Sequence, residues 1–298
     1  MNIFTKGMWF GLAAAFCFSL MSLFAKFAKD LPSQELVLAR SIFILIATYF
    51  VMKQKGLNIW GLAENRLILF LRGFSGYIAL SLFFFSLKGL HIGSATLVQY
   101  LSPIFSSIFA LFFLKEQVAN KQWWSLIFCF IGIAFISGIL PNLHFNDSFN
   151  WHSLIACLLS SCLSGIAYVC VRKLSIKDES ADVIIFYFPL VSLPFALIAS
   201  VTNWVTPTLW QSICLVGVCI SSYYGQLFLT YSLKLEETSN ASKMLYFGAV
   251  FASTWGFIFL NEKITLGFIV GACLIIGSQL LLGNRKSTTI VKKKNITT

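Results

Sequence analysis

Basic side chains lie within long apolar stretches of this chain, where charged groups are rare. Arg40 and Arg72 each stand about six residues, or roughly 9 Å of helix, inside such a stretch, and Lys243 lies just inside a later one. A charge is costly in an apolar environment. If these stretches cross a lipid bilayer, the three side chains face a cavity or a partner, or extend to the polar headgroups of the nearest lipids. If two of the three line a cavity, its field is positive. Such a cavity favours a carboxylate, a phosphate or a comparable anionic group, alone or within a zwitterion.

Other polar side chains in the apolar stretches could hold the rest of a ligand. They are amides and aromatic residues with a polar edge: Gln99, Tyr100, Tyr224, Gln226, Tyr246 and Trp255. Polar groups within a membrane span seek partners on another helix or on a ligand, and both interpretations stay open. Aromatic rings with a polar edge are suitable lining for a small-molecule cavity. Together with the three basic residues, they form the predicted substrate-binding set.

Three further residues are candidates for gating or structural roles. Pro103 lies inside an expected helix, where it removes one backbone hydrogen bond and favours a kink. Glu116 and Glu262 close two expected helices, each followed at once by another. A carboxylate there suits the positive N-terminal end of the next helix, and a role as a proton carrier stays open.

The sequence contains none of the patterns that indicate an enzyme or a metal site. There is no GxGxxG, GxxxxGK[ST], HExxH or GxSxG motif, and the histidines have no clustered carboxylates. The eight cysteines all fall in apolar stretches without metal-ligand spacing, as packing residues do. We therefore expect no catalytic residue, no metal, no cofactor and no ATP drive within this chain.

Composition predicts an all-α integral membrane protein that positions these side chains. Of the 298 residues, 58% are hydrophobic and 11% are charged, and the mean hydropathy is +0.82. A soluble domain carries about 25% charged residues. Apolar stretches recur that are long enough to cross about 30 Å of hydrocarbon. We expect ten transmembrane helices, at roughly 7–28, 34–53, 66–87, 93–114, 121–139, 151–171, 182–202, 209–232, 240–260 and 264–283.

The basic residues are distributed unevenly between the two sides of these helices. With the N-terminus in the cytoplasm, the outer connections hold only Lys29, Lys88 and Lys263, with Lys26 near a helix end. Because positive charge gathers on the cytoplasmic side, we expect both termini there, in the inner or plasma membrane. The net charge of +11 then needs no nucleic acid, and the tail can touch anionic lipid of the bilayer. The oligomeric state is not predicted.

Residues 86–116 and 232–262 are similar at a constant offset, without a gap. Ten of the 31 positions are identical, where unrelated apolar segments would share roughly 2 or 3. Five helices per copy would place the copies in opposite orientations, the inverted repeat of many transporters that work by alternating access. We expect a first repeat over 1–140, an external linker over 141–150, a second repeat over 151–283 and a basic cytoplasmic tail over 284–298.

Several short motifs resemble the drug/metabolite transporter superfamily, EamA type. They are Phe113-Leu114-Lys115-Glu116, Phe259-Leu260-Asn261-Glu262, Leu38-Ala39-Arg40, Leu71-Arg72-Gly73 and Tyr100-Leu101-Ser102-Pro103. The resemblance covers about residues 7–283. It implies a central cavity near the second to fourth and seventh to ninth helices, with Arg40, Arg72, Tyr100 and Tyr246 as candidates. In the second repeat, Phe247-Gly248-Ala249 stands in place of Leu101-Ser102-Pro103, so the halves need not bend alike.

The resemblance implies a secondary transporter, often an exporter, and not an enzyme. We expect its substrates to be small metabolites such as amino acids or other carboxylate-bearing compounds. A multidrug exporter is the alternative if the cavity is mostly aromatic and the two arginines face lipid. Transport of S-adenosylmethionine or a nucleotide-like metabolite also stays open. A structure without a central cavity would favour a non-transporting membrane scaffold.

Overall fold

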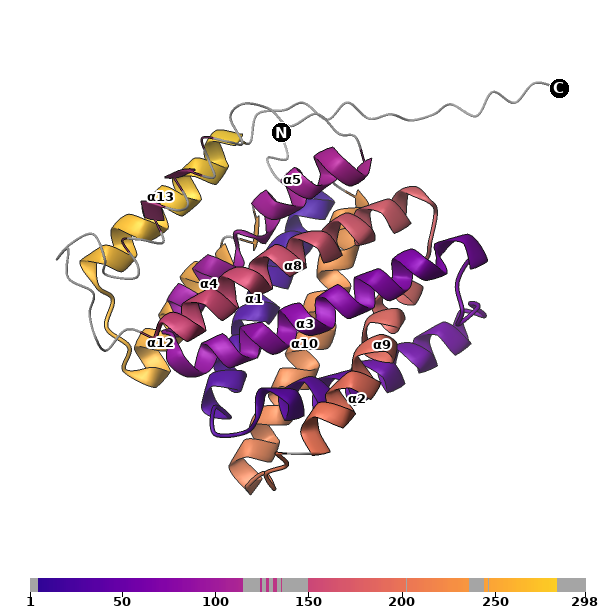
Figure 1. Ribbon diagram of the computed structural model, residues 1–298, viewed down its shortest axis with the longest axis horizontal. Helices are drawn as coiled ribbons and strands as arrows, with labels where there is room; N and C mark the ends of the chain where they lie inside the picture. Colours follow the sequence, from indigo (N-terminus) through magenta and orange to yellow (C-terminus); the bar gives the residue numbers. More distant parts are fainter. Residues whose placement is uncertain are drawn as a thin grey trace.

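The computed structural model describes residues 5–114, 124, 127–128, 131–132, 135, 150–201, 203–235, 244–245 and 247–282 (Figure 1). Every regular element in these ranges is a helix, and seven segments are long and apolar enough to cross a membrane. The helices are α1 (Lys6–Phe27), α2 (Ser33–Gln54), the 3-10 helix η1 (Ala63–Asn65), α3 (Arg66–Gly89), α4 (Ile92–Gln99), α5 (Ser102–Leu114), α8 (Trp151–Ile176), α9 (Ala181–Val201), α10 (Leu209–Leu235), α12 (Phe247–Leu260) and α13 (Leu266–Leu282).

The helices bury small and hydroxyl side chains and expose large apolar ones. Ser160 and Ser192 are fully buried, whereas Phe112, Ile198 and Leu266 are 71%, 70% and 78% exposed. In a soluble protein this distribution would be costly, because large apolar side chains would meet water. In a bilayer, small residues let helices approach closely while apolar side chains face lipid. The bundle therefore has the surface of an integral membrane protein.

Local sequence explains where several helices begin. The Thr5 hydroxyl accepts a hydrogen bond from the Met8 amide at 3.3 Å, and the Asn150 side chain accepts one from the Ser153 amide at 3.1 Å. Both are N-caps, which satisfy amides that have no partner inside the helix. Pro32 precedes α2, where its fixed φ suits the start of a helix.

The principal helix contacts join the two halves of the chain. α1 packs chiefly against α10 and α3 against α8, while α2 pairs with α9 and α4 with α12. Figure 1 shows α3 and α8 side by side, with α13 at the edge of the bundle. The pairs are related in a regular way, because the first helix of each half contacts the third helix of the other. The halves thus interlock, and a space between them is lined by both.

One predicted helix is divided in the structure. The expected span over 93–114 consists of α4 and α5, separated at Tyr100 and Leu101. Pro103 therefore lies in the first turn of α5 and not within a continuous helix. At that position the missing amide hydrogen costs nothing, because the first amides of a helix have no intrahelical partner. The bend expected at Pro103 thus takes the form of a break in the helix at Tyr100 and Leu101, just before the proline.

Candidate functional site

A cavity lies between α1, α2, α3, α4, α8, α9 and α10. It is lined by Phe18, Met21, Ser22, Arg40, Arg72, Gly76, Ala79, Leu80, Phe83, Thr96, Gln99, Tyr100, Ser164, Ala167, Tyr168, Phe188 and Gln226. The centres of water-sized molecules can occupy about 90 Å³ of it. One water needs roughly 10–15 Å³ on this measure, so the cavity has room for several waters or a small ligand group.

Two arginines meet on one aromatic ring in this cavity. The guanidinium carbons of Arg40 and Arg72 lie 4.7 Å and 4.8 Å from the ring centroid of Phe188. Arg40 is 1% exposed and Arg72 is 4% exposed. A cation over an aromatic face is attracted by the electrons of the ring, more strongly when water is excluded. Phe188 on α9 thus holds together two cations that come from α2 and α3.

Two glycines allow α3 to approach α9 closely enough for this arrangement. A Cβ atom on Gly73 would lie 2.7 Å from the Cβ of Val191, and one on Gly76 would lie 2.6 Å from both Arg72 Nη1 and the Phe188 ring. At such distances the neighbouring side chains would have to move to admit any larger residue. The contact of Arg72 with Phe188 therefore depends on the absence of a side chain one turn further along α3.

The arginines carry several hydrogen-bond donors without an acceptor. Arg72 Nη2 donates to Oε1 of Gln226 at 3.0 Å. In the part of the chain that the structure describes, Nε of both arginines and Nη1 of Arg40 are buried without a partner. No Asp or Glu is among the described residues that line the cavity. Because unpaired buried donors are costly, these groups are suited to an anionic ligand.

Most other polar groups of the lining are already engaged with neighbouring helices or their own helix. Gln99 Nε2 donates to Ser164 Oγ at 2.8 Å, and its Oε1 lies 2.8 Å from the Ser160 hydroxyl. The hydroxyls of Thr96 and Ser22 donate to carbonyls of the preceding turn, at 2.7 Å and 3.0 Å. These side chains shape the wall, while the unpaired donors come from the guanidinium groups.

Tyr100 connects the cavity to the second half of the chain. It follows α4, is 4% exposed and lies against Gly248 of α12. A Cβ atom at Gly248 would overlap the tyrosine hydroxyl, so only glycine fits there. The departure of the second repeat at this position, Phe247-Gly248-Ala249, therefore has a packing reason.

The structure brings together five of the nine predicted substrate-binding residues: Arg40, Arg72, Gln99, Tyr100 and Gln226. Tyr224 is 46% exposed and lies outside this lining. Trp255 also lies outside it, and its Nε1 donates to Ser19 Oγ on α1 at 3.1 Å. Lys243, Tyr246 and the candidate gating residue Glu116 are outside the described residues.

Glu262 has a structural partner that sequence spacing did not indicate. Its carboxylate oxygens accept from the Ile92 amide at 3.1 Å and 3.2 Å, at the N-terminus of α4. The expected partner was the next helix, α13, but the carboxylate turns towards the other half of the chain. His91 Nδ1 lies 3.5 Å away, and this hydrogen bond raises the pKa of His91. Glu262 therefore ties the two halves at one end of α4.

Phe188, Tyr168, Thr96 and Ser164 also line the cavity, and the sequence did not single them out. Phe188 is one of 31 phenylalanines, most of which have no distinguishing neighbour. Its position before Pro189 is a weak signal at most. Residues of this kind become recognisable only through the helices that surround them.

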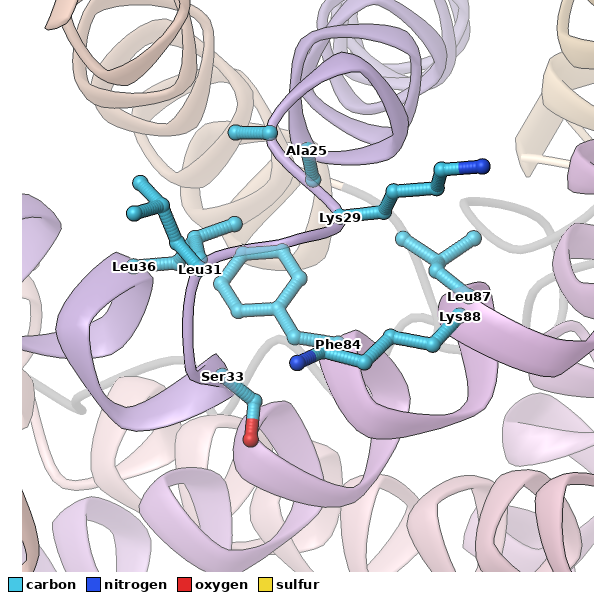
Figure 2. Close-up of a pocket in the computed structure, with 9 residues that line it drawn as sticks. Ala25, Lys29, Leu31, Ser33, Leu36, Phe84, Leu87 and Lys88 are labelled. Carbon is cyan, nitrogen blue, oxygen red and sulfur yellow. The ribbon is translucent and has the colours of Figure 1, made fainter. Parts of the chain in front are cut away.

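A second hollow lies where α1 ends and α2 begins, beside the end of α3 (Figure 2). Lys29 and Lys88 carry amines at this hollow, and Leu31, Leu36 and Phe84 are among the apolar side chains that line it. It has no measurable room for the centre of a water-sized molecule. The larger cavity is therefore the stronger candidate for a ligand site.

Comparisons with known proteins agree with this architecture. The pattern of the EamA-like transporter family matches the chain twice, at residues 5–138 and 151–284. The pseudopaline exporter CntI of Pseudomonas aeruginosa (strain UCBPP-PA14) is 27% identical over 288 residues, which cover 96% of this chain and 99% of that protein. Solute carrier family 35 member G1 of Homo sapiens is 26% identical, with 94% and 79% covered.

Two further matches extend the comparison. The S-adenosylmethionine uptake transporter of Rickettsia bellii is 25% identical over 226 residues, which cover 75% of this chain and 74% of that protein. A solved crystal structure matches with a TM-score of 0.67 at 15% identity and covers 93% of this chain and 96% of its own. At that identity the structural match concerns the fold alone.

Proposed function

Because the chain belongs to the EamA-like transporter family, we propose that it is a secondary transporter of small metabolites that carry an anionic group. The membrane transporter class follows from the family, while the substrate class is our inference from the cavity. The matched relatives are named for different substrates, so sequence similarity alone does not identify the substrate of this chain.

One observation supports the anionic substrate above all others. Arg40 and Arg72 are buried in the cavity wall, retain unpaired donors and have no carboxylate beside them among the described lining residues. Arginine stays protonated at physiological pH. A ligand with a carboxylate or phosphate would satisfy these donors with charge-assisted hydrogen bonds. A cationic drug would be repelled by the same groups.

We further propose that the ten expected helices form two inverted repeats that work by alternating access. The double family match and the exchange of partners between α1, α3, α8 and α10 support this architecture. In such carriers the site lies between the repeats and opens to each side in turn. The excess of basic residues on one side supports cytoplasmic termini in the inner or plasma membrane. We propose outward transport, the direction in the name of the CntI relative.

Transport assays on the purified protein in proteoliposomes test this proposal. Labelled carboxylates, amino acids, S-adenosylmethionine and a cationic dye would be compared in uptake and counterflow. We expect carboxylate flux in the wild type and its loss in the Arg40→Gln, Arg72→Gln double variant. Arg66→Gln is a matched control, because Arg66 is an exposed arginine at the start of the same helix, α3.

Two results would contradict the proposal. Dye flux at an undiminished rate in the double variant, without carboxylate flux in the wild type, would indicate a multidrug exporter. The absence of flux for every compound, with a correctly folded protein, would favour the non-transporting scaffold.

A further inference from the structure

We propose that the substrate carries two negative charges, as two carboxylates or as one doubly ionised phosphoryl group. This inference rests on the proposed function, because it assumes that the cavity is the transport site. It concerns the charge of this chain's ligand, which membership of the family does not specify.

The number of buried cations carries the argument. Two guanidinium groups stack on Phe188, so their carbons are no farther apart than the sum of 4.7 Å and 4.8 Å. The described lining contributes no acidic side chain. Like charges in a poorly solvated space repel each other, and each also loses its hydration. A monoanion would leave one positive charge uncompensated, whereas a dianion would neutralise the pair.

The distribution of free donors leads to the same conclusion. Among the residues that the structure describes, Arg40 has two nitrogen atoms without a partner, Nε and Nη1, and Arg72 has one, Nε. The free donors are thus divided between two side chains on different helices, α2 and α3. A single carboxylate has two oxygens and is suited to one guanidinium group in a bidentate contact. Two carboxylates, or the three terminal oxygens of a phosphoryl group, supply enough acceptors for both.

Among the described residues of the lining, no carboxylate offers a counter-site for a cation. Gln99, Thr96 and Ser22 are engaged in hydrogen bonds within the protein, and Gln226 Oε1 accepts from Arg72. The hydroxyl oxygens of Thr96 and Ser22 can still accept, but an ammonium group beside two guanidinium groups would need a carboxylate to offset their repulsion. A zwitterion with no net charge would therefore bind less well than a dianion of the same size.

A charge-matched series in proteoliposomes at about pH 8 tests this inference, because both carboxylates, and a phosphoryl group with its second pKa near 6, are ionised there. The probes are butanedioate, its monoamide, butanoate and glycerol phosphate, measured by counterflow. We expect the dianions to be transported about tenfold or more faster than the monoanions, since one buried charge would otherwise stay unpaired. The two dianions distinguish a dicarboxylate site from a phosphoryl site.

Single variants provide the sharper measurement. In Arg40→Gln and in Arg72→Gln, one cation remains, so the preference for dianions should fall to near equality with monoanions. In Arg66→Gln the preference should be unchanged. Thermal stabilisation of each purified variant by butanedioate and butanoate gives a second readout that does not require flux.

The failures of the two proposals are distinguishable. Equal transport of butanoate and both dianions by the wild type, with loss in the double variant, would overturn the dianion and leave the anion transporter intact. Unchanged dianion preference in both single variants would also overturn it. No binding or flux of any of these anions would overturn both proposals.

Discussion

Arg40 illustrates how a single residue can oppose stability and support function. Its guanidinium group is buried on Phe188 with two nitrogens unpaired among the described residues. Replacing a buried ion pair by apolar side chains of similar volume is often neutral or stabilising by about 1–4 kcal/mol, and a buried cation without a counter-ion has no ion-pair attraction to lose. We therefore expect Arg40 to bind the ligand and not to stabilise the fold.

We therefore expect Arg40→Met to raise the melting temperature of the purified protein while strongly reducing dianion transport. The increase in the free energy of unfolding should not exceed about 4 kcal/mol, the upper end of that range. Differential scanning fluorimetry and counterflow on the same preparation would measure both effects. A variant that lost stability together with transport would instead indicate that Arg40 supports the packing of α2.

Gly76 determines whether Arg72 and Phe188 can share one space. A methyl group there would lie 2.6 Å from both, so Gly76→Ala should displace the guanidinium group and reduce transport strongly. Gly277→Ala in α13 is the matched control, because nothing lies within 4 Å of its added Cβ. Transport by Gly76→Ala at the wild-type rate would show that the stacked arrangement is not required.

At the scale of elements, α2 and α9 are joined at both ends by acidic side chains. Lys55, just after α2, lies 2.7 Å from Asp182 in the first turn of α9, and Glu35 near the start of α2 accepts from the Val205 amide beyond α9 at 2.6 Å. The Ser41 and Ser192 hydroxyls are 2.8 Å apart between the same helices. These contacts hold the helices that carry Arg40 and Phe188.

Asp182→Asn should weaken the connection between the end of α2 and the start of α9. Lys55 is 46% exposed, so the pair contributes only about 0.2–1 kcal/mol, and the melting temperature should fall by about 4 °C at most. High salt should reduce the difference. Asp178→Asn is the control, because Asp178 is exposed and its positive φ of 57° suits asparagine equally well. A salt-independent loss would point to packing instead of the ion pair.

The contact of α4 with the end of α12 should depend on pH through His91. The Glu262 carboxylate raises the pKa of His91, mainly by the hydrogen bond, against the opposing effects of burial and of Lys26. The stabilisation is therefore complete below the unfolded value of about 6.5 and is lost as pH rises through the higher folded value. Melting curves of the wild type and His91→Gln should differ near pH 5.5 and converge near pH 9, well above ordinary histidine values.

A double-mutant cycle checks that Glu262 is the partner. In a Glu262→Gln background, His91→Gln should have the same effect at both pH values. A difference that persisted at high pH in the original background would assign the effect to the shape of the side chain instead of its charge.

At the scale of the whole molecule, the interlocked halves enclose a cavity whose charge affects the transport cycle. An empty carrier would have to pass through a closed state with two uncompensated guanidinium groups, whereas a loaded carrier would not. Charges that lose their water without a partner raise the free energy of such a state.

We therefore expect exchange to be faster than net flux. Uptake of labelled dianion into proteoliposomes should rise several-fold when unlabelled dianion is present inside. In Arg40→Met, any residual flux should lose this stimulation, because one of the two charges is gone. Equal rates with and without internal substrate would contradict the argument.

Much of the fold followed from the sequence because the signals are local. Apolar stretches predicted helices near 7–28, 34–53 and 66–87, and the structure has α1, α2 and α3 there within two residues. The duplicated segment and its motifs indicated a family that matches the chain twice. Arg40 and Arg72 were recognisable as candidates because an ionised side chain within an apolar stretch is energetically costly and usually has a partner or a ligand.

Only the tertiary structure decided which side chains meet. Phe188 and Gln226 join Arg72 from helices more than 100 positions away in the sequence, while Tyr224 and Trp255 lie outside the cavity lining. In a soluble helix, an apolar stripe would indicate the inward face. Here lipid and protein interior are equally apolar, so hydropathy determines that a helix spans the membrane but not which face it turns to its neighbours. That rotation, fixed by close packing at Gly73 and Gly76, brings two arginines to one ring.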